Sequence, residues 1–122
     1  MAYLGAELTP GVELILRETG LPDAVQKVDL VITGEGYLDA WTAMGKAPAG
    51  IAKLAKQYGK PVIAFCGAAG EGTDACHAVG VDAYFPILRR VESLGEALDP
   101  VIAKQNLTDT AEQVFRLMQL HI

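Results

Sequence analysis

The sequence lacks the features that mark membrane and secreted proteins. No apolar run approaches the roughly 20 residues that a membrane-spanning helix needs. Only two cysteines, Cys66 and Cys76, occur, which is too few for a disulfide-stabilised scaffold. The first residues contain no basic segment followed by an apolar one, as a secretory signal would. We therefore expect no membrane association, a reducing cytoplasmic location and cysteines that serve as buried structural thiols.

Positive charge is also scarce. Ten Lys and Arg residues stand against 15 Asp and Glu residues, which gives a net charge of -5 and an isoelectric point near 4.9. No cluster of basic residues offsets this charge, so we expect no nucleic acid partner. The length of 122 residues and the 51% hydrophobic content are typical of one soluble globular domain.

Apolar runs alternate with segments of helical periodicity. The runs at 29–33, 62–66 and 81–85 predict three buried strands. Helices are expected at 10–19, 48–58, 73–79 and 108–120, with a short turn or helix at 22–27. Ser93 and Glu96 form the pattern of a capping box before another helix, which Pro100 is expected to kink or break.

This order predicts an α/β fold, with a Rossmann-like parallel sheet of about three strands and helices on both faces. So narrow a sheet leaves apolar strand edges uncovered. We therefore expect either a homodimer that pairs through a sheet edge, or a segment that belongs to a longer protein.

The segment 33–46 gathers the polar groups that point to chemistry. It follows the first strand, and ligands usually bind beyond the carboxyl ends of such strands. Gly34 and Gly36 would let the backbone approach a ligand closely. Glu35 and Asp39 could hold Mg²⁺ or accept a proton, and Lys46 could contact a phosphate or carboxylate. The alternative is a surface loop with solvated acidic residues.

Two common phosphate-binding motifs do not fit this segment. The P-loop pattern fails because Ala40 stands at the first glycine position and Ala47 at the hydroxyl position. The dinucleotide pattern G-x-G-x-x-G fails because Asp39 stands at its third glycine, which disfavours a dinucleotide-dependent oxidoreductase. The second glycine-rich connection, at 67–72, matches neither pattern.

The pattern Gly-Glu-Gly-x-x-Asp-x-x-Thr-x-x-Gly-Lys over residues 34–46 resembles the carboxyl-terminal portion of the bacterial glycerate kinase family of the first type. The resemblance extends upstream to residues 4–11, and downstream through 59–63 to 80–83. It covers nearly the whole chain but only about the last third of a family member. Two positions depart from the family pattern, which usually has arginine in place of Tyr37 and glutamine in place of Trp41.

The resemblance implies that residues 1–122 form a partial Rossmann-like domain of a two-domain kinase. Such an enzyme uses ATP and Mg²⁺ to phosphorylate D-glycerate to 2-phosphoglycerate. Asp39 and Glu35 would be the catalytic residues or Mg²⁺ ligands. The residues implied to bind substrate or phosphate are Gly34, Gly36, Thr42, Gly45 and Lys46. The alternative is a non-catalytic truncated module that dimerises or binds nucleotide weakly.

Overall fold

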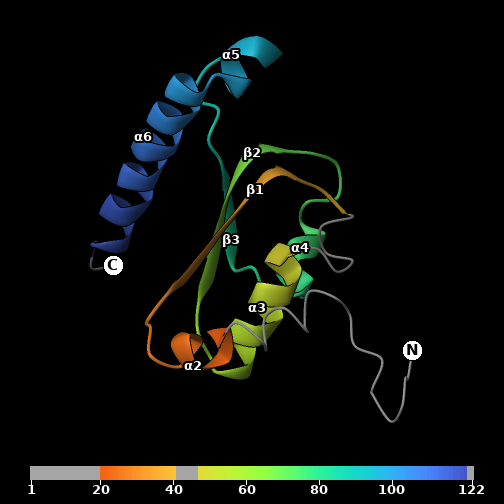
Figure 1. Ribbon diagram of the computed structural model, residues 1–122, viewed down its shortest axis with the longest axis vertical. Coiled ribbons are helices and arrows are strands. Elements are labelled where there is room, and N and C mark those ends of the chain that lie inside the picture. Colours follow the sequence, from red (N-terminus) through yellow and green to blue (C-terminus); the bar gives the residue numbers. More distant parts are fainter. Residues whose placement is uncertain (1–19, 41–46, 121–122) are drawn as a thin grey trace.

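The computed structural model describes residues 20–40 and 47–120, so the helix predicted at 10–19 lies outside the described residues. Figure 1 shows the arrangement of the elements. In chain order they are α2 (Leu21–Val25), β1 (Val31–Leu38), α3 (Ala47–Gln57), β2 (Val62–Ala69), α4 (Ala75–Ala78), β3 (Ala83–Pro86), α5 (Leu94–Leu98) and α6 (Pro100–Met118).

The three strands form one parallel sheet in the order β1-β2-β3. Val31 of β1 lies opposite Val62 of β2, and Ile63 of β2 lies opposite Ala83 of β3. Helices α2, α3 and α4 lie on one side of this sheet, and α6 lies on the other (Figure 1). The predicted α/β fold with helices on both faces is therefore confirmed.

Alternating side chains of β2 belong to two hydrophobic clusters, one on each face of the sheet. Val62, Ala64 and Cys66 belong to a buried cluster on the side of α2, α3 and α4. Ile63 and Phe65 form a second, smaller cluster with Val114 of α6. Because β2 is covered on both faces, it is the continuous apolar run that a central parallel strand requires.

The ends of several elements differ from the sequence prediction. β1 was predicted to end at residue 33 but continues to Leu38, so Glu35 and the glycines beside it lie in a strand and not in a loop. β2 likewise extends to Ala69, α4 spans only Ala75–Ala78, and β3 begins at Ala83. Glycine lowers strand propensity, but the hydrogen bonds between β1 and β2 outweigh this local preference here.

Helix α6 begins earlier than predicted. The break expected at Pro100 is present, because α5 ends at Leu98, Asp99 is extended and a new helix begins at Pro100. This helix continues to Met118, whereas the last helix was predicted to begin at about residue 108. Proline is well tolerated at the first helical position because its missing N–H would have no partner there. Asp99 caps this helix, and Ser93 with Glu96 forms the predicted capping box of α5.

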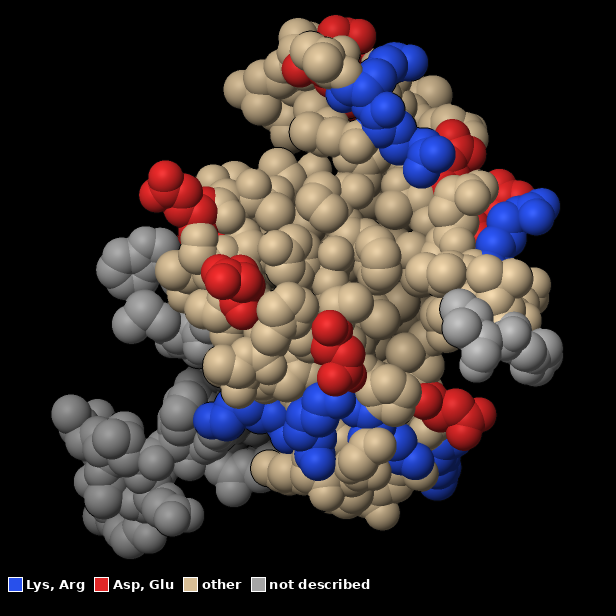
Figure 2. Space-filling model, turned by 180° about the vertical axis from the view of Figure 1, so that it is seen from behind, with Lys and Arg blue, Asp and Glu red and all other residues tan. Residues whose placement is uncertain are grey.

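Figure 2 shows Lys and Arg in a row across the lower part of one face of the molecule, with acidic side chains above the row and further charged side chains near the top and right margins. Lys56 of α3 pairs with Asp82 at 2.6 Å, and both side chains are partly exposed. No helix in the described part of the chain is long and apolar enough to cross a membrane.

Candidate functional site

Asp39 lies in a cavity at the carboxyl ends of β1 and β2. The cavity has a volume of about 630 Å³ and is lined by Tyr37, Asp39, Ala40, Glu71 and Gly72. The first three residues come from the end of β1, and the other two come from the connection between β2 and α4. Two acidic residues from different connections therefore line one cavity, at the edge where parallel α/β sheets usually bind ligands.

Backbone hydrogen bonds join the two connections on either side of Asp39. The Gly70 N–H donates to the Leu38 carbonyl at 2.7 Å, and the Ala40 N–H donates to the Glu71 carbonyl at 3.2 Å. The buried hydroxyl of Thr73 lies 3.0 Å from the Leu38 oxygen and 2.6 Å from the Gly70 oxygen, and can donate to either. These contacts fix the backbone that carries Asp39.

Tyr37 forms one wall of the cavity by lying against Gly70. A β-carbon at position 70 would collide with the hydroxyl and ring of Tyr37. The tyrosine is 52% exposed, so its ring covers backbone on one side and faces solvent on the other. A neutral aromatic side chain thus forms this wall of the cavity.

Cys66 and Cys76 are both buried, as predicted. Burial, and secondarily the charge of Asp39, raises the pKa of the Cys76 thiol. Burial, and secondarily Cys76, raises the pKa of Cys66 to about 11. Both thiols therefore stay protonated at neutral pH, which disfavours a nucleophilic or metal-binding role.

Glu35 lines a different cavity. A groove of about 530 Å³ lies between the sheet and helices α5 and α6, and we call it the α5–α6 groove. Its lining comprises residues 32–36 of β1, 65–67 of β2, and residues 87, 97, 98, 103 and 107. Gly34 and Gly36 belong to it, and Glu35 accepts a hydrogen bond from the Gly36 N–H at 3.2 Å.

The structure thus assigns the predicted residues to three groups. Asp39 lines the cavity at the strand ends, whereas Glu35, Gly34 and Gly36 line the α5–α6 groove. The third group lies outside the described residues and consists of Trp41, Thr42, Gly45 and Lys46.

Sequence reasoning missed Glu71, the second carboxylate of the Asp39 cavity. Its signal was available, because Glu71 lies in the glycine-rich connection that follows the second predicted strand. The carboxyl ends of adjacent parallel strands meet at one edge of a sheet, so acidic residues after both strands are expected to be neighbours.

The two acidic residues that line the Asp39 cavity are of the type that would hold a magnesium ion together with a substrate phosphate. Mg²⁺ prefers oxygen ligands and is commonly held by one or two carboxylates together with waters and substrate phosphates. Asp39 and Glu71 supply that donor set. Among the residues described, no group of three His, Cys, Asp or Glu side chains could hold a metal ion.

Comparison with known proteins identifies the family. The model of the glycerate kinase family matches residues 1–119. The chain belongs to the glycerate kinase family. It is 50% identical over 98 residues to a glycerate kinase of Halalkalibacterium halodurans, and 42% identical over 112 residues to one of Haemophilus influenzae. These matches cover 80% and 92% of this chain, but only 26% and 29% of the two relatives.

A solved structure supports the same assignment. The crystal structure reported under the name glycerate kinase 2, from Salmonella typhimurium LT2, superposes with a TM-score of 0.62 at 33% identity. The match covers 98% of this chain and 30% of that chain. This glycerate kinase family chain therefore spans less than a third of the relatives it matches.

Proposed function

We propose that this chain supplies part of the active site for the ATP-dependent phosphorylation of D-glycerate to 2-phosphoglycerate. Family membership supports kinase chemistry, and one relative, from Escherichia coli, is named glycerate 2-kinase. The observation that carries the proposal is the cavity that Asp39 and Glu71 both line, at the carboxyl ends of two parallel strands.

Asp39 is the first candidate for the catalytic carboxylate. It accepts the proton of the glycerate hydroxyl that attacks the γ-phosphate, or it holds Mg²⁺ together with Glu71. Glu35, the second candidate, lines the other cavity, so the arrangement of the cavities favours Asp39. Bound Mg²⁺ neutralises the charge of the transferring phosphoryl group.

The remaining roles follow the family pattern. Lys46 contacts a phosphate or the glycerate carboxylate, with Thr42 and Gly45 beside it in the segment that leads to α3. Gly34 and Gly36 have no side chains, so the β1 backbone is accessible to a ligand at these two positions. Phosphoryl transfer depends mainly on positioning and charge neutralisation, which such a set of groups can supply.

The test is turnover with ATP, Mg²⁺ and D-glycerate, with the product detected by mass spectrometry. It should be run on the purified chain, and on a chimera in which the chain replaces the matched segment of the Haemophilus influenzae relative. Asp39→Asn is expected to lower kcat by about 10²- to 10⁴-fold, the range typical of a lost general base.

Asp74→Asn is the matched control. Asp74 is exposed at the start of α4, makes no capping hydrogen bond with its side chain, and does not line the cavity. The control should keep kcat within about twofold, because surface substitutions of this kind have small effects. An unchanged rate in Asp39→Asn would contradict the assignment of Asp39.

One observation favours the alternative of a non-catalytic module. The chain spans only 26–29% of the two curated relatives compared above. Turnover by the chimera but not by the isolated chain would establish this alternative for the chain alone. Turnover by the isolated chain would exclude it.

A further inference from the structure

The α5–α6 groove is apolar and open to solvent. Ile32 from β1, Phe65 from β2, Leu98 from α5 and Leu107 from α6 line it. Glu35 is the one charged residue among the described residues that line the groove. A small polar ligand would find few hydrogen-bonding side chains here, whereas an apolar surface would fit.

Large side chains of the groove are exposed to an unusual degree. Leu98 is 70% exposed, Ile32 is 47% exposed and Leu107 is 43% exposed. The apolar surface continues along α6 through Phe115 and Met118, which lie eight and eleven residues after Leu107 and therefore on the same flank of the helix. Several large apolar side chains exposed on one side of the molecule favour an interface with another polypeptide.

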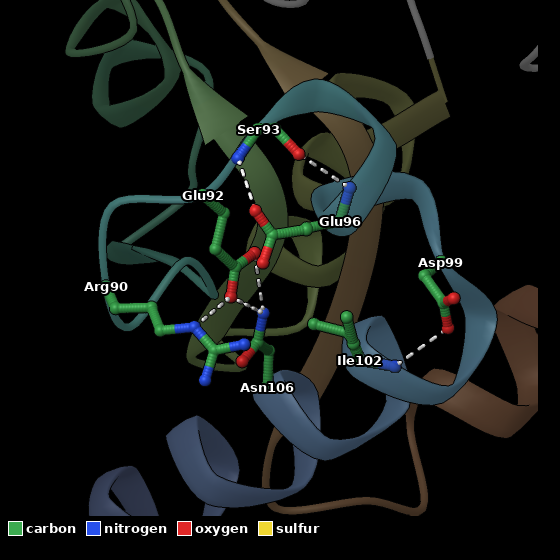
Figure 3. A network of polar contacts seen from close by, with 7 residues as sticks. All are labelled: Arg90, Glu92, Ser93, Glu96, Asp99, Ile102 and Asn106. Carbon is green, nitrogen blue, oxygen red and sulfur yellow. Dashed lines mark hydrogen bonds and ion pairs between the residues drawn. The ribbon is translucent and has the colours of Figure 1, made fainter.

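Polar contacts hold the walls of the groove in place (Figure 3). The Glu92 side chain is fully buried, pairs with Arg90 at 3.5 Å and accepts a hydrogen bond from the Asn106 amide at 3.2 Å. This network ties α6 to the segment that precedes α5. Ser93 and Glu96 exchange hydrogen bonds at the start of α5. The groove is thus a preformed surface that does not need to fold on binding.

We propose that the groove is the docking surface for the part of the glycerate kinase fold that lies outside the matched segment. About 70% of each relative's length falls outside the match, and that portion must contact this one somewhere. Among the described residues, β1 pairs with β2 alone, so the groove also opens beside an edge strand. The inference rests on family membership and not on the proposed reaction.

The test compares the accessibility of one groove position in two settings. Leu98→Cys is introduced into the isolated chain and into the chimera with the Haemophilus influenzae relative. Maleimide labelling is followed by peptide mass spectrometry, which separates the new thiol from the buried Cys66 and Cys76. Gln105→Cys, at an exposed position of α6, is the matched control.

Leu98→Cys is expected to react at least roughly tenfold more slowly in the chimera than in the isolated chain, because covered positions react only after local opening. Gln105→Cys should react at similar rates in both. Equal labelling of Leu98→Cys in both settings would overturn the proposal. So would protection in the isolated chain together with a dimeric mass by light scattering, since a second copy would then cover the groove.

If the chimera fails to fold, the accessibility of the groove can still be tested in a complete relative. The same two cysteines are then placed at the aligned positions of the Haemophilus influenzae relative, a complete chain. Labelling reports docking whether or not phosphoglycerate is formed. Protection without turnover would therefore support the docking surface while contradicting the proposed reaction.

Discussion

At the scale of single residues, two glycines on neighbouring strands allow the backbones of β1 and β2 to approach closely. A β-carbon on Gly67 of β2 would lie only 2.5 Å from the carbonyl oxygen of Gly36 in β1. A β-carbon on Gly36 itself would have no atom within 4 Å. Glycine is therefore required at position 67 but not at position 36, although the two residues lie on neighbouring, hydrogen-bonded strands.

Gly67→Ala is expected to lower the free energy of unfolding by about 1–3 kcal/mol, because the rigid backbone of β1 must move to accept the methyl group. Gly36→Ala is the control and should stay within about 0.5 kcal/mol, the usual range where nothing is displaced. Urea denaturation followed by circular dichroism measures both. Equal losses in the two variants would show that the contact does not limit the packing of the strands.

Single residues also show how far sequence reasoning extends. The burial of Cys66 and Cys76 followed from their place in apolar runs, and it is confirmed. The sequence could not show that Glu35 and Asp39 face different cavities. That difference depends on where β1 ends, and the pairing of the β1 backbone with β2 determines that end.

At the scale of elements, α6 begins where the chain was expected to interrupt a helix. The Asp99 carboxylate accepts hydrogen bonds from the N–H groups of Val101, at 2.9 Å, and Ile102, at 3.3 Å. Pro100 takes the first helical position. The same proline therefore marks both the predicted break after α5 and the beginning of α6, and the capping aspartate before it is the sequence signal for that beginning.

Asp99→Ala is expected to destabilise the chain by about 1 kcal/mol, the typical cost of losing a helix cap. Asp99→Asn keeps an oxygen that can accept the same hydrogen bonds and should retain most of the stability. Thermal unfolding followed by circular dichroism compares the two variants. A loss as large in Asp99→Asn as in Asp99→Ala would indicate that charge, and not the cap, provides the stabilisation.

The central parts of elements were predictable, whereas many of their ends were not. The continuous apolar run of β2 and the capping box at Ser93 were sufficient local signals. Gly34, Gly36 and Gly67 have no local preference for a strand, yet the hydrogen bonds of the sheet extend β1 and β2 through them. Long-range pairing of this kind leaves no periodic signal in the sequence.

At the scale of the whole molecule, one carboxylate connects three parts of the chain. Asp82, which precedes β3, accepts hydrogen bonds from the ammonium group of Lys56 in α3 at 2.6 Å and from the Val62 N–H in β2 at 2.7 Å. The hydrogen bond from Lys56, and then the one from Val62, lowers the pKa of the Asp82 carboxyl below its usual value of 3.8.

A carboxyl with a lowered pKa in the folded state stabilises the fold at pH values above its ordinary pKa, and this stabilisation is lost as the pH falls through the folded-state value. The chain should therefore lose stability on acidification below about pH 4. Asp82→Asn should be less stable near neutral pH and should show a weaker dependence on acid. Urea titrations at several pH values test this.

The exposure of Asp82 limits the size of the effect, and a second aspartate provides a control. The Asp82 side chain is about half exposed, so solvent screening keeps the effect small. Asp23→Asn makes the same chemical change at an exposed position of α2 and serves as the control. Parallel acid profiles for the wild type and Asp82→Asn would contradict the role of this carboxylate.

The contact between Tyr37 and Gly70 has a consequence for how the family can diverge. Any side chain at position 70 would displace the phenol from its place over the backbone. The two positions should therefore not vary independently across homologues. Sequences that keep an aromatic residue at position 37 should retain glycine at position 70, whereas those with another residue at 37 are free to change both. We therefore expect positions 37 and 70 to covary in a deep alignment of the family, because the packing of this cavity wall constrains both.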